Sequence, residues 1–174
     1  RFRWLFEAPP KSRTEFTDWI GTASASIDPM FFAVTDATTG RTEGRQALMR
    51  IDQTHGVIEI GSIMWGPALQ RSRMATEALF LFADHVFTLG YRRFEWKCND
   101  QNVPSKRAAL RFGFRPEGVF RQHMVVKGAS RDTAWFAMTD RDWQHLRPGY
   151  LAWLAPGNFD AQGHQLRKLE EFVQ

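Results

Sequence analysis

The sequence predicts a single domain with a mixed α/β sheet, and three observations carry this prediction. First, residues 57–65 form a strand pattern rich in Val, Ile, Met and Trp, which Gly66-Pro67 stops. Second, a long amphipathic helix pattern follows, and residues 92–98 then form another strand pattern. Such a crossover makes the two strands parallel neighbours. Third, two strand patterns precede this unit and a hairpin pattern follows it, within a length of 174 residues that fits one domain.

The segment before the first strand predicts a helix. Ser12 fits the N-cap position, and Glu15, three residues later, fits the second half of a capping box. Asp28-Pro29 ends the helix, because the residue before a proline disfavours the helical conformation. Four apolar side chains share one side of this helix: Phe16, Trp19, Ile20 and Ala23.

Two strands follow, at residues 30–35 and at about 43–51, separated by turn-like residues 36–40. The second strand alternates with a period of two, so its residues divide between two faces. We expect one face to carry Ala47, Met49 and Ile51, and the other Gln46, Leu48 and Arg50. A turn at residues 52–56 leads into the strand at 57–65 and completes an antiparallel meander.

The helix after the central strand has an apolar face and a polar beginning. Its apolar residues recur at spacings of three, four and seven: Met74, Ala78, Leu81, Phe82, Val86 and Leu89. Residues 70–75 show no apolar periodicity. A helix that begins there presents unpaired N–H groups and a positive dipole end, which together form an anion site. Arg71 and Arg73 add two positive charges, and Gly90 serves as the C-cap.

The rest of the chain predicts one more strand, a short helix and a hairpin. In the strand at 92–98, Phe94, Trp96 and Cys98 alternate with charged residues, which indicates a half-buried strand. Pro104 suits the first turn of a helix that runs to about Phe112 and stops at Gly113. The remaining expected elements are strands at 119–126 and 133–138 joined by a turn at 127–132, then two short helical patches in a segment interrupted by Pro148 and Pro156.

Composition excludes several classes of protein. The net charge is +4 and the positive residues are scattered, which disfavours a nucleic-acid binder but suits an anionic ligand. Asp84 and His85 interrupt the longest apolar run, so no membrane span is predicted. The single cysteine, Cys98, rules out an internal disulfide and suits a cytoplasmic protein. The histidines lack metal-ligand spacing, so we predict no metal site. No signal peptide is visible, and because the chain starts at Arg1 we expect an upstream segment to be missing.

Four short motifs follow one another in the middle of the chain. They are Gln70-Arg71-Ser72-Arg73-Met74-Ala75 with Thr76-Glu77-Ala78, then Asn102-Val103-Pro104-Ser105, then Arg111-Phe112-Gly113-Phe114, and finally Glu117-Gly118 with a hairpin carrying Arg131-Asp132. In this order, over roughly residues 30–143, they resemble the GNAT superfamily of acyl-CoA-dependent N-acyltransferases, and within it the branch of ribosomal-protein N-terminal acetyltransferases. The first three resemble that family's Gln/Arg-x-x-Gly-x-Gly/Ala loop, its Asn-x-x-Ser motif and its Leu-Gly-Phe motif.

The resemblance implies a fold and an activity. The fold is a mostly antiparallel mixed sheet with helices on both faces and a splayed central strand pair. It would occupy residues 1–147, its first strand absent upstream, with a C-terminal extension at 148–174 that packs on the domain or on a partner such as a second copy in a homodimer. The implied activity is direct transfer of an acyl group, most simply acetyl, from acetyl-CoA or another acyl-CoA to a primary amine. The acceptor would be a protein N-terminus or a small molecule, and the extra arginines would also suit a succinyl donor.

The family pattern also assigns binding residues. The diphosphate of the co-substrate would rest on residues 70–75, and its thiol arm would pass Met64, Trp65 and Gly66. Asn102 would hydrogen-bond that arm. The family's central glycine is Arg73 here, which must either turn its side chain aside or grip the phosphate with it.

Three residues are candidates for catalysis. Glu59 is the one acid in an apolar strand, which suits a general base, and the alternative is structural pairing with Arg45 or Arg50. By resemblance Ser105 would protonate the departing thiolate, and its alternative is helix capping. The imidazole of His123 suits a general base, and the alternative is a histidine of the surface or the core without a catalytic role.

One departure from the family supports a different class of function. Many relatives carry a tyrosine four residues before Gly113, but this chain has Ala109 there, so a phenolic acid from that position is excluded. A non-catalytic module that binds or senses acyl-CoA therefore stands as the alternative to an enzyme.

Overall fold

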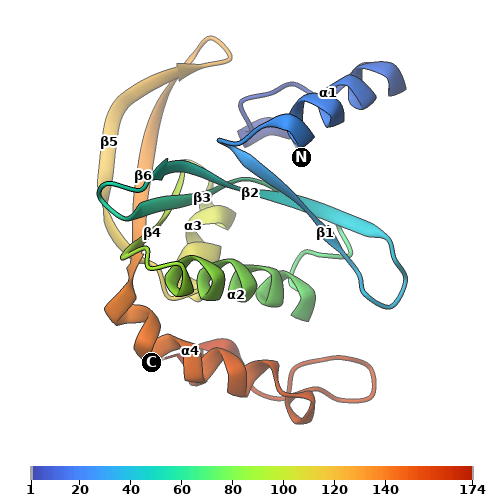
Figure 1. Cartoon of the computed structure of the whole chain (residues 1–174), viewed down its shortest axis with the longest axis vertical. Coiled ribbons are helices and arrows are strands. Elements are labelled where there is room, and N and C mark those ends of the chain that lie inside the picture. Colours follow the sequence, from blue (N-terminus) through green and yellow to red (C-terminus); the bar gives the residue numbers. More distant parts are fainter. Residues whose placement is uncertain (1, 174) are drawn as a thin grey trace.

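The computed structural model describes residues 2–173 as a six-stranded mixed sheet with helices on both of its faces (Figure 1). The strand order across the sheet is β1-β2-β3-β4-β6-β5. The strands are β1 (Met30–Thr35), β2 (Thr42–Asp52), β3 (Val57–Trp65), β4 (Arg93–Asn99), β5 (Arg115–Val126) and β6 (Ala129–Thr139). The α-helices are α1 (Arg13–Ala25), α2 (Arg73–Thr88), α3 (Val103–Arg111) and α4 (Asp140–Leu154), and short 3-10 turns lie at Phe2–Trp4, Pro156–Asn158 and Leu169–Glu171. No helix within residues 2–173 is long and apolar enough to cross a membrane.

The two faces of the sheet carry different helices. On one face, α2, α3 and α4 share a single aromatic core with β3, β4 and β6. On the other face, α1 packs through Trp19 against Phe31 of β1, with their ring centroids 5.4 Å apart. Figure 1 shows α1 above the sheet and α2 and α4 below it. The predicted fold, with helices on both faces, is confirmed.

The central strands β3 and β4 are parallel, as the crossover predicts, and they separate halfway along. Only Val57–Ile60 of β3 pairs with β4. The rest of β3, Gly61–Trp65, pairs with β2 on one side, and on its other side no described strand is paired with it. This is the splayed strand pair that the family resemblance implies, and it opens the sheet beside the N-terminus of α2.

Several local predictions hold in detail. The bounds of β1 and β3 are as expected, and Gly90 follows α2 in the left-handed conformation that a C-terminal glycine permits. The hydroxyl of Ser12 caps α1 by accepting from the amide N–H of Glu15 at 3.0 Å. The other half of the expected capping box is shifted, since the Glu15 carboxylate accepts from the amide N–H of Lys11 at 2.6 Å.

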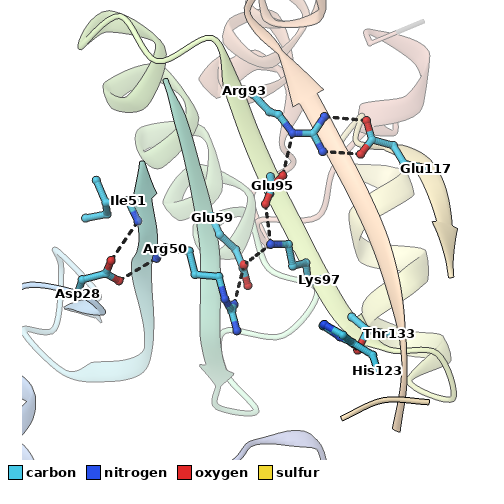
Figure 2. A network of polar contacts seen from close by, with 10 residues as sticks. All are labelled: Asp28, Arg50, Ile51, Glu59, Arg93, Glu95, Lys97, Glu117, His123 and Thr133. Atoms are coloured by element: carbon cyan, nitrogen blue, oxygen red, sulfur yellow. Dashed lines mark hydrogen bonds and ion pairs between the residues drawn. The ribbon is translucent and has the colours of Figure 1, made fainter. Parts of the chain in front are cut away.

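The expected alternation of β2 breaks at Arg50. This residue has a φ of 49°, and the pairing with β3 shifts between Met49 and Asp52. The carboxylate of Asp28 accepts from the backbone N–H groups of Arg50 and Ile51, at 2.8 and 3.1 Å (Figure 2). This bulge takes Arg50 away from the face of Gln46 and Leu48 and brings its guanidinium to a carboxylate on β3.

The apolar face expected for α2 is only partly correct. Leu81 and Leu89 are 58% and 60% exposed, whereas Leu79, Phe80 and Ala83 are buried. The reason is that α2 lies between the sheet and α4 and so buries two sides. Its second contact is with aromatic residues of α4, where the ring of Phe80 lies 5.7 Å from that of Trp143 and 5.9 Å from that of Tyr150.

The last third of the chain is more regular than predicted. The hairpin turn is only Lys127-Gly128, both with positive φ (52° and 78°), so residues 129–132 belong to β6 instead of a turn. The two short helical patches are replaced by one long helix, α4, which runs through Pro148. A proline inside a helix removes one hydrogen bond, and this loss is offset by burial of four α4 side chains: Trp143, Leu146, Tyr150 and Trp153.

Candidate active site

A cavity of about 490 Å³ lies where β3 and β4 separate. It is lined by residues of β3, β4, the N-terminus of α3, the β5–β6 hairpin and the N-terminal segment at residues 4–6. All three catalytic candidates, Glu59, Ser105 and His123, line this cavity, and so does Asn102. The structure thus brings together residues from three distant parts of the sequence: β3, the beginning of α3 and β5.

Glu59 belongs to a chain of alternating charges that crosses the sheet from Arg50 to Glu117 (Figure 2). Its Oε2 accepts from the guanidinium of Arg50 at 2.7 Å and lies 3.1 Å from Nζ of Lys97. Lys97 also contacts Glu95 at 2.7 Å, and Glu95 accepts from Arg93 at 2.8 Å. The chain ends at Glu117, which forms two hydrogen bonds with Arg93. The structural pairing with Arg50 is therefore present, whereas Arg45, the other partner considered, pairs with Glu7.

The environment of Glu59 is suited to holding and releasing a proton. Its side chain is only 4% exposed, and this burial raises its pKa above the ordinary value of 4.5, although Lys97 and Arg50 oppose the rise. Both cations contact Oε2, and within residues 2–173 no hydrogen bond reaches Oε1. A Cβ on Gly61 would lie 3.3 Å from Oε1, so the glycine keeps space beside that oxygen. Oε1 is thus the oxygen available for proton transfer.

Asn102 and Ser105 lie together at the beginning of α3. The Asn102 side chain caps this helix by accepting from the amide N–H of Ser105 at 3.3 Å. The Ser105 hydroxyl accepts from the indole N–H of Trp96 at 3.0 Å. A hydroxyl that accepts one bond still has its own proton to donate. Ser105 therefore lines the cavity and keeps a hydroxyl proton that it can donate.

His123 lies at the cavity wall but apart from the chain of charges. Its Nδ1 is 3.0 Å from the hydroxyl of Thr133, and its ring lies edge-on to Phe120 and near Trp135. Figure 2 shows it beside Thr133, with no contact drawn to Glu59 or to the other charged residues. The structure thus places His123 in the site without linking it to the acidic candidate.

The segment before α2 is arranged as an anion site. The Ser72 hydroxyl caps the helix by accepting from the amide N–H of Ala75 at 3.1 Å, and Gln70 is exposed. Within the described chain the amide N–H groups of Arg71, Arg73 and Met74 form no hydrogen bond. Three free N–H groups at the positive end of a 16-residue helix suit a diphosphate.

The two arginines of this segment behave differently. Arg71 has a φ of 59°, a left-handed conformation that is uncommon for a residue with a side chain. Arg73 turns aside: its guanidinium donates to the carbonyl of Leu154 at 2.5 Å and lies 4.6 Å from the ring centroid of Phe159. Of the two alternatives open for Arg73, the structure shows the one in which the side chain leaves the phosphate site.

The three residues expected along the thiol arm lie at the separated edge of β3. The Trp65 indole donates to Gln46 at 3.3 Å, and Met64 faces a second, smaller cavity beside Arg45. Gly66 ends the strand by donating to the carbonyl of Glu43. None of these three residues lines the main cavity. The residues of β3 that line it in their place precede them: Gly61, Ser62 and Ile63.

Sequence reasoning gave no role in the site to two charged residues of the cavity, Lys97 and Arg131, although Arg131 belongs to the last of the four motifs. The strand pattern places Lys97 on the exposed side, yet its side chain is 9% exposed. The sequence did contain a sign of its role. Two acids in neighbouring strands, Glu59 and Glu95, require a cation between them, and Lys97 is that cation. Arg131 was missed because a turn was expected at its position.

Comparison with known proteins gives clear matches. A family model described as an acetyltransferase (GNAT) domain matches residues 1–115. The crystal structure of a GCN5-related N-acetyltransferase from Brucella melitensis is 61% identical with a TM-score of 0.96, and the match covers 99% of this chain and 78% of that one. A probable acetyltransferase of the GNAT family from Chromobacterium violaceum is 40% identical with a TM-score of 0.78, covering 82% of this chain and 72% of that one.

A curated relative matches a shorter region. The protein named uncharacterized N-acetyltransferase p20, from Bacillus licheniformis, is 29% identical over 117 residues, which is 64% of this chain. The chain spans 63% of the length of that relative. The family model includes the separated part of β3, the segment before α2 and the beginning of α3, so every residue from Glu59 to Ser105 lies within it.

Proposed function

The chain belongs to the GNAT family of acetyltransferases, and on that basis we propose that it transfers an acyl group, most simply acetyl, from acyl-CoA to a primary amine. The observation that carries this proposal is the separation of β3 and β4 directly beside the buried carboxylate of Glu59. A thioester arm needs a gap in the sheet, and an amine needs a proton acceptor at the end of that gap. This chain has both in one cavity. Its single cysteine fits a cytoplasmic enzyme.

The residues present fit the co-substrate. The free N–H groups of Arg71, Arg73 and Met74 would hold its diphosphate. The edge of β3 from Gly61 to Trp65 would pair with the amides of its thiol arm, because no described strand pairs with that edge. Asn102 lies at the other side of the same gap.

In the proposed reaction the amine is bound together with the thioester. Its nitrogen attacks the thioester carbonyl carbon, so that a C–N bond forms and the C–S bond breaks. The amine proton passes to Oε1 of Glu59, which must therefore be ionised. The departing thiolate takes a proton from the Ser105 hydroxyl, which regains one from solvent, and Glu59 releases its proton to solvent before the next turnover.

A direct assay tests the proposal. The protein is incubated with acetyl-CoA and a panel of primary amines that includes peptides with free N-termini, and both thiol release and acetylated product are measured. We expect amine-dependent thiol release matched by product, and saturable binding of CoA by calorimetry. Binding of CoA without turnover of any amine would instead indicate an acyl-CoA-binding module, and absence of CoA binding would contradict both functions.

Asn102 allows its two roles to be separated. Asn102→Ala removes the α3 cap, which should lower the free energy of unfolding by about 1 kcal/mol, and also removes the amide from the cavity. Asn102→Ser keeps a capping hydroxyl but not the amide. We expect both variants to bind CoA more weakly in calorimetry, and only the alanine variant to lose stability in urea denaturation. Normal CoA binding by Asn102→Ser would show that Asn102 acts only as a cap.

A further inference from the structure

The cavity contains a buried cation without an anionic partner. Arg131 of β6 is 7% exposed, and its Nε is buried without a hydrogen bond. Within residues 2–173 no carboxylate lies in ion-pair distance of it, and burial lowers its pKa. A buried charge is normally paired, because leaving water is costly for an ion. Arg45, which is equally buried, has Glu7 as its partner. The unpaired state of Arg131 therefore calls for an explanation.

Arg131 lies on the side of the sheet that also carries Glu59. Along β6, alternate residues Ala134, Phe136 and Met138 face the helical core, so Arg131 points to the opposite face together with Thr133 and Trp135. The cavity on that face is lined by Arg131, Glu59 and Lys97. The anion site before α2 is on the other, helical side. A ligand held by Arg131 would thus approach from the face opposite to the diphosphate.

The contacts of Arg131 leave the hydrogen-bonding edge of its guanidinium available. The ring of Phe6 lies over the guanidinium plane, 4.9 Å from ring centroid to Cζ. Such a stack covers one face of the plane and none of the N–H groups at its edge. That edge matches the two oxygens of a carboxylate. The other cavity cations, Arg50 and Lys97, are already bound to Glu59.

We propose that Arg131 binds the carboxylate of the amine acceptor, and hence that the acceptor is a small amine carrying a free carboxylate, of the amino-acid or short-peptide class. This proposal rests on the function proposed above. The carboxylate would be held at Arg131 while the amine lies toward Glu59, both on the same wall of one cavity. A succinyl donor would carry the same chemical group, but from the side of the thiol arm, and the experiment separates these two sources.

The test compares matched acceptors. Amino acids and dipeptides are supplied with acetyl-CoA as free carboxylates and as the corresponding amides, and kcat/KM is measured for each. Wild type should prefer the carboxylate form by about 10- to 100-fold, as expected for charged hydrogen bonds. Arg131→Gln should abolish that preference by lowering kcat/KM for the carboxylate form only, with CoA affinity unchanged. Arg131→Lys keeps the positive charge but lacks the paired N–H donors of the guanidinium, and it should restore part of the preference.

Controls distinguish the possible failures. Arg121→Gln removes an equal charge from the same hairpin at an exposed position outside the cavity, and it should leave the preference intact. Equal losses for both acceptor forms in Arg131→Gln would overturn the proposal, as would a selective loss of transfer from succinyl-CoA. Turnover of amines with no carboxylate preference in wild type would also overturn it, while leaving the acyltransferase function in place. The melting temperature of each variant excludes unfolding as the cause.

Discussion

Glu59→Gln is expected to lower kcat by about 10²-fold or more, the range associated with loss of a general base. Glutamine keeps the shape of the side chain and can still bond to Arg50, but it cannot take the proton of the amine. The affinity for CoA should stay within about twofold of wild type, since Glu59 lies on the wall away from the anion site. The measurements are steady-state kinetics with saturating acceptor and calorimetry with CoA.

The pH dependence of kcat/KM gives a second readout of the same residue. Burial raises the pKa of Glu59 above 4.5, and a base acts only when ionised. The rate should therefore fall as the pH drops through this raised pKa, and the fall should begin at higher pH than for an exposed glutamate. The acceptor for this measurement should be an amine whose own pKa lies well below that of Glu59. Such an amine stays unprotonated throughout the range, so that only the carboxylate titrates. In Glu59→Gln the acidic limb should be absent.

A matched control separates proton transfer from general electrostatics. Glu117→Gln changes the last acid of the same chain of charges, at a position 42% exposed and outside the cavity. Its kinetics and its acidic limb should resemble those of wild type. If Glu59→Gln retained normal turnover, or if both variants lost it equally, Glu59 would have no place in the mechanism.

Local features of the chain were predictable because their causes are local. Ser12 caps the helix that follows it directly, and Gly90, which has no side chain, readily adopts the left-handed conformation that ends α2. The strand–helix–strand order likewise fixes the parallel pair β3 and β4 through chain connectivity. These features locate the anion site, and the family resemblance adds the gap in the sheet, Asn102 and Ser105.

Features that depend on distant segments were missed. The sequence offers both Arg45 and Arg50 as partners of Glu59, but it does not predict the bulge in β2 that selects Arg50. The side chain of Asp28, 22 residues away, holds this bulge. Leu81 is exposed because α4 covers a different side of α2 than the apolar spacing suggests. Arg131 enters the cavity because the β5–β6 turn has two residues instead of six, which extends β6 by four positions. In each case the sequence pattern is compatible with both outcomes, and packing decides.

The second large effect is expected at Lys97. Its ammonium lies 3.1 Å from Glu59 and 2.7 Å from Glu95, and all three side chains are nearly buried. Lys97→Met keeps an unbranched apolar side chain but removes the ammonium, which lies 3.7 Å from the ring centroid of Trp135. It leaves two buried carboxylates with one cation each, Arg50 and Arg93. We expect the free energy of unfolding at neutral pH to fall by about 3 kcal/mol, as measured by urea denaturation.

The same substitution should move the catalytic titration. Lys97 opposes the rise in the pKa of Glu59, so its removal raises that pKa further and shifts the acidic limb of kcat/KM to higher pH. An acid whose pKa is raised in the folded state destabilises the fold above that pKa. The stability lost in Lys97→Met should therefore shrink as the pH falls through the raised pKa.

A compensating variant shows whether the charges or the packing cause these effects. Combining Lys97→Met with Glu59→Gln and Glu95→Gln removes the two uncompensated carboxylates, and it should regain most of the lost stability while remaining inactive. If Lys97 served only to fill space between the strands, the single variant would be stable and its acidic limb unmoved. A shifted limb together with restored stability would mean that Lys97 balances two needs of one site: it keeps a buried base ionised, and it limits what that burial costs the fold.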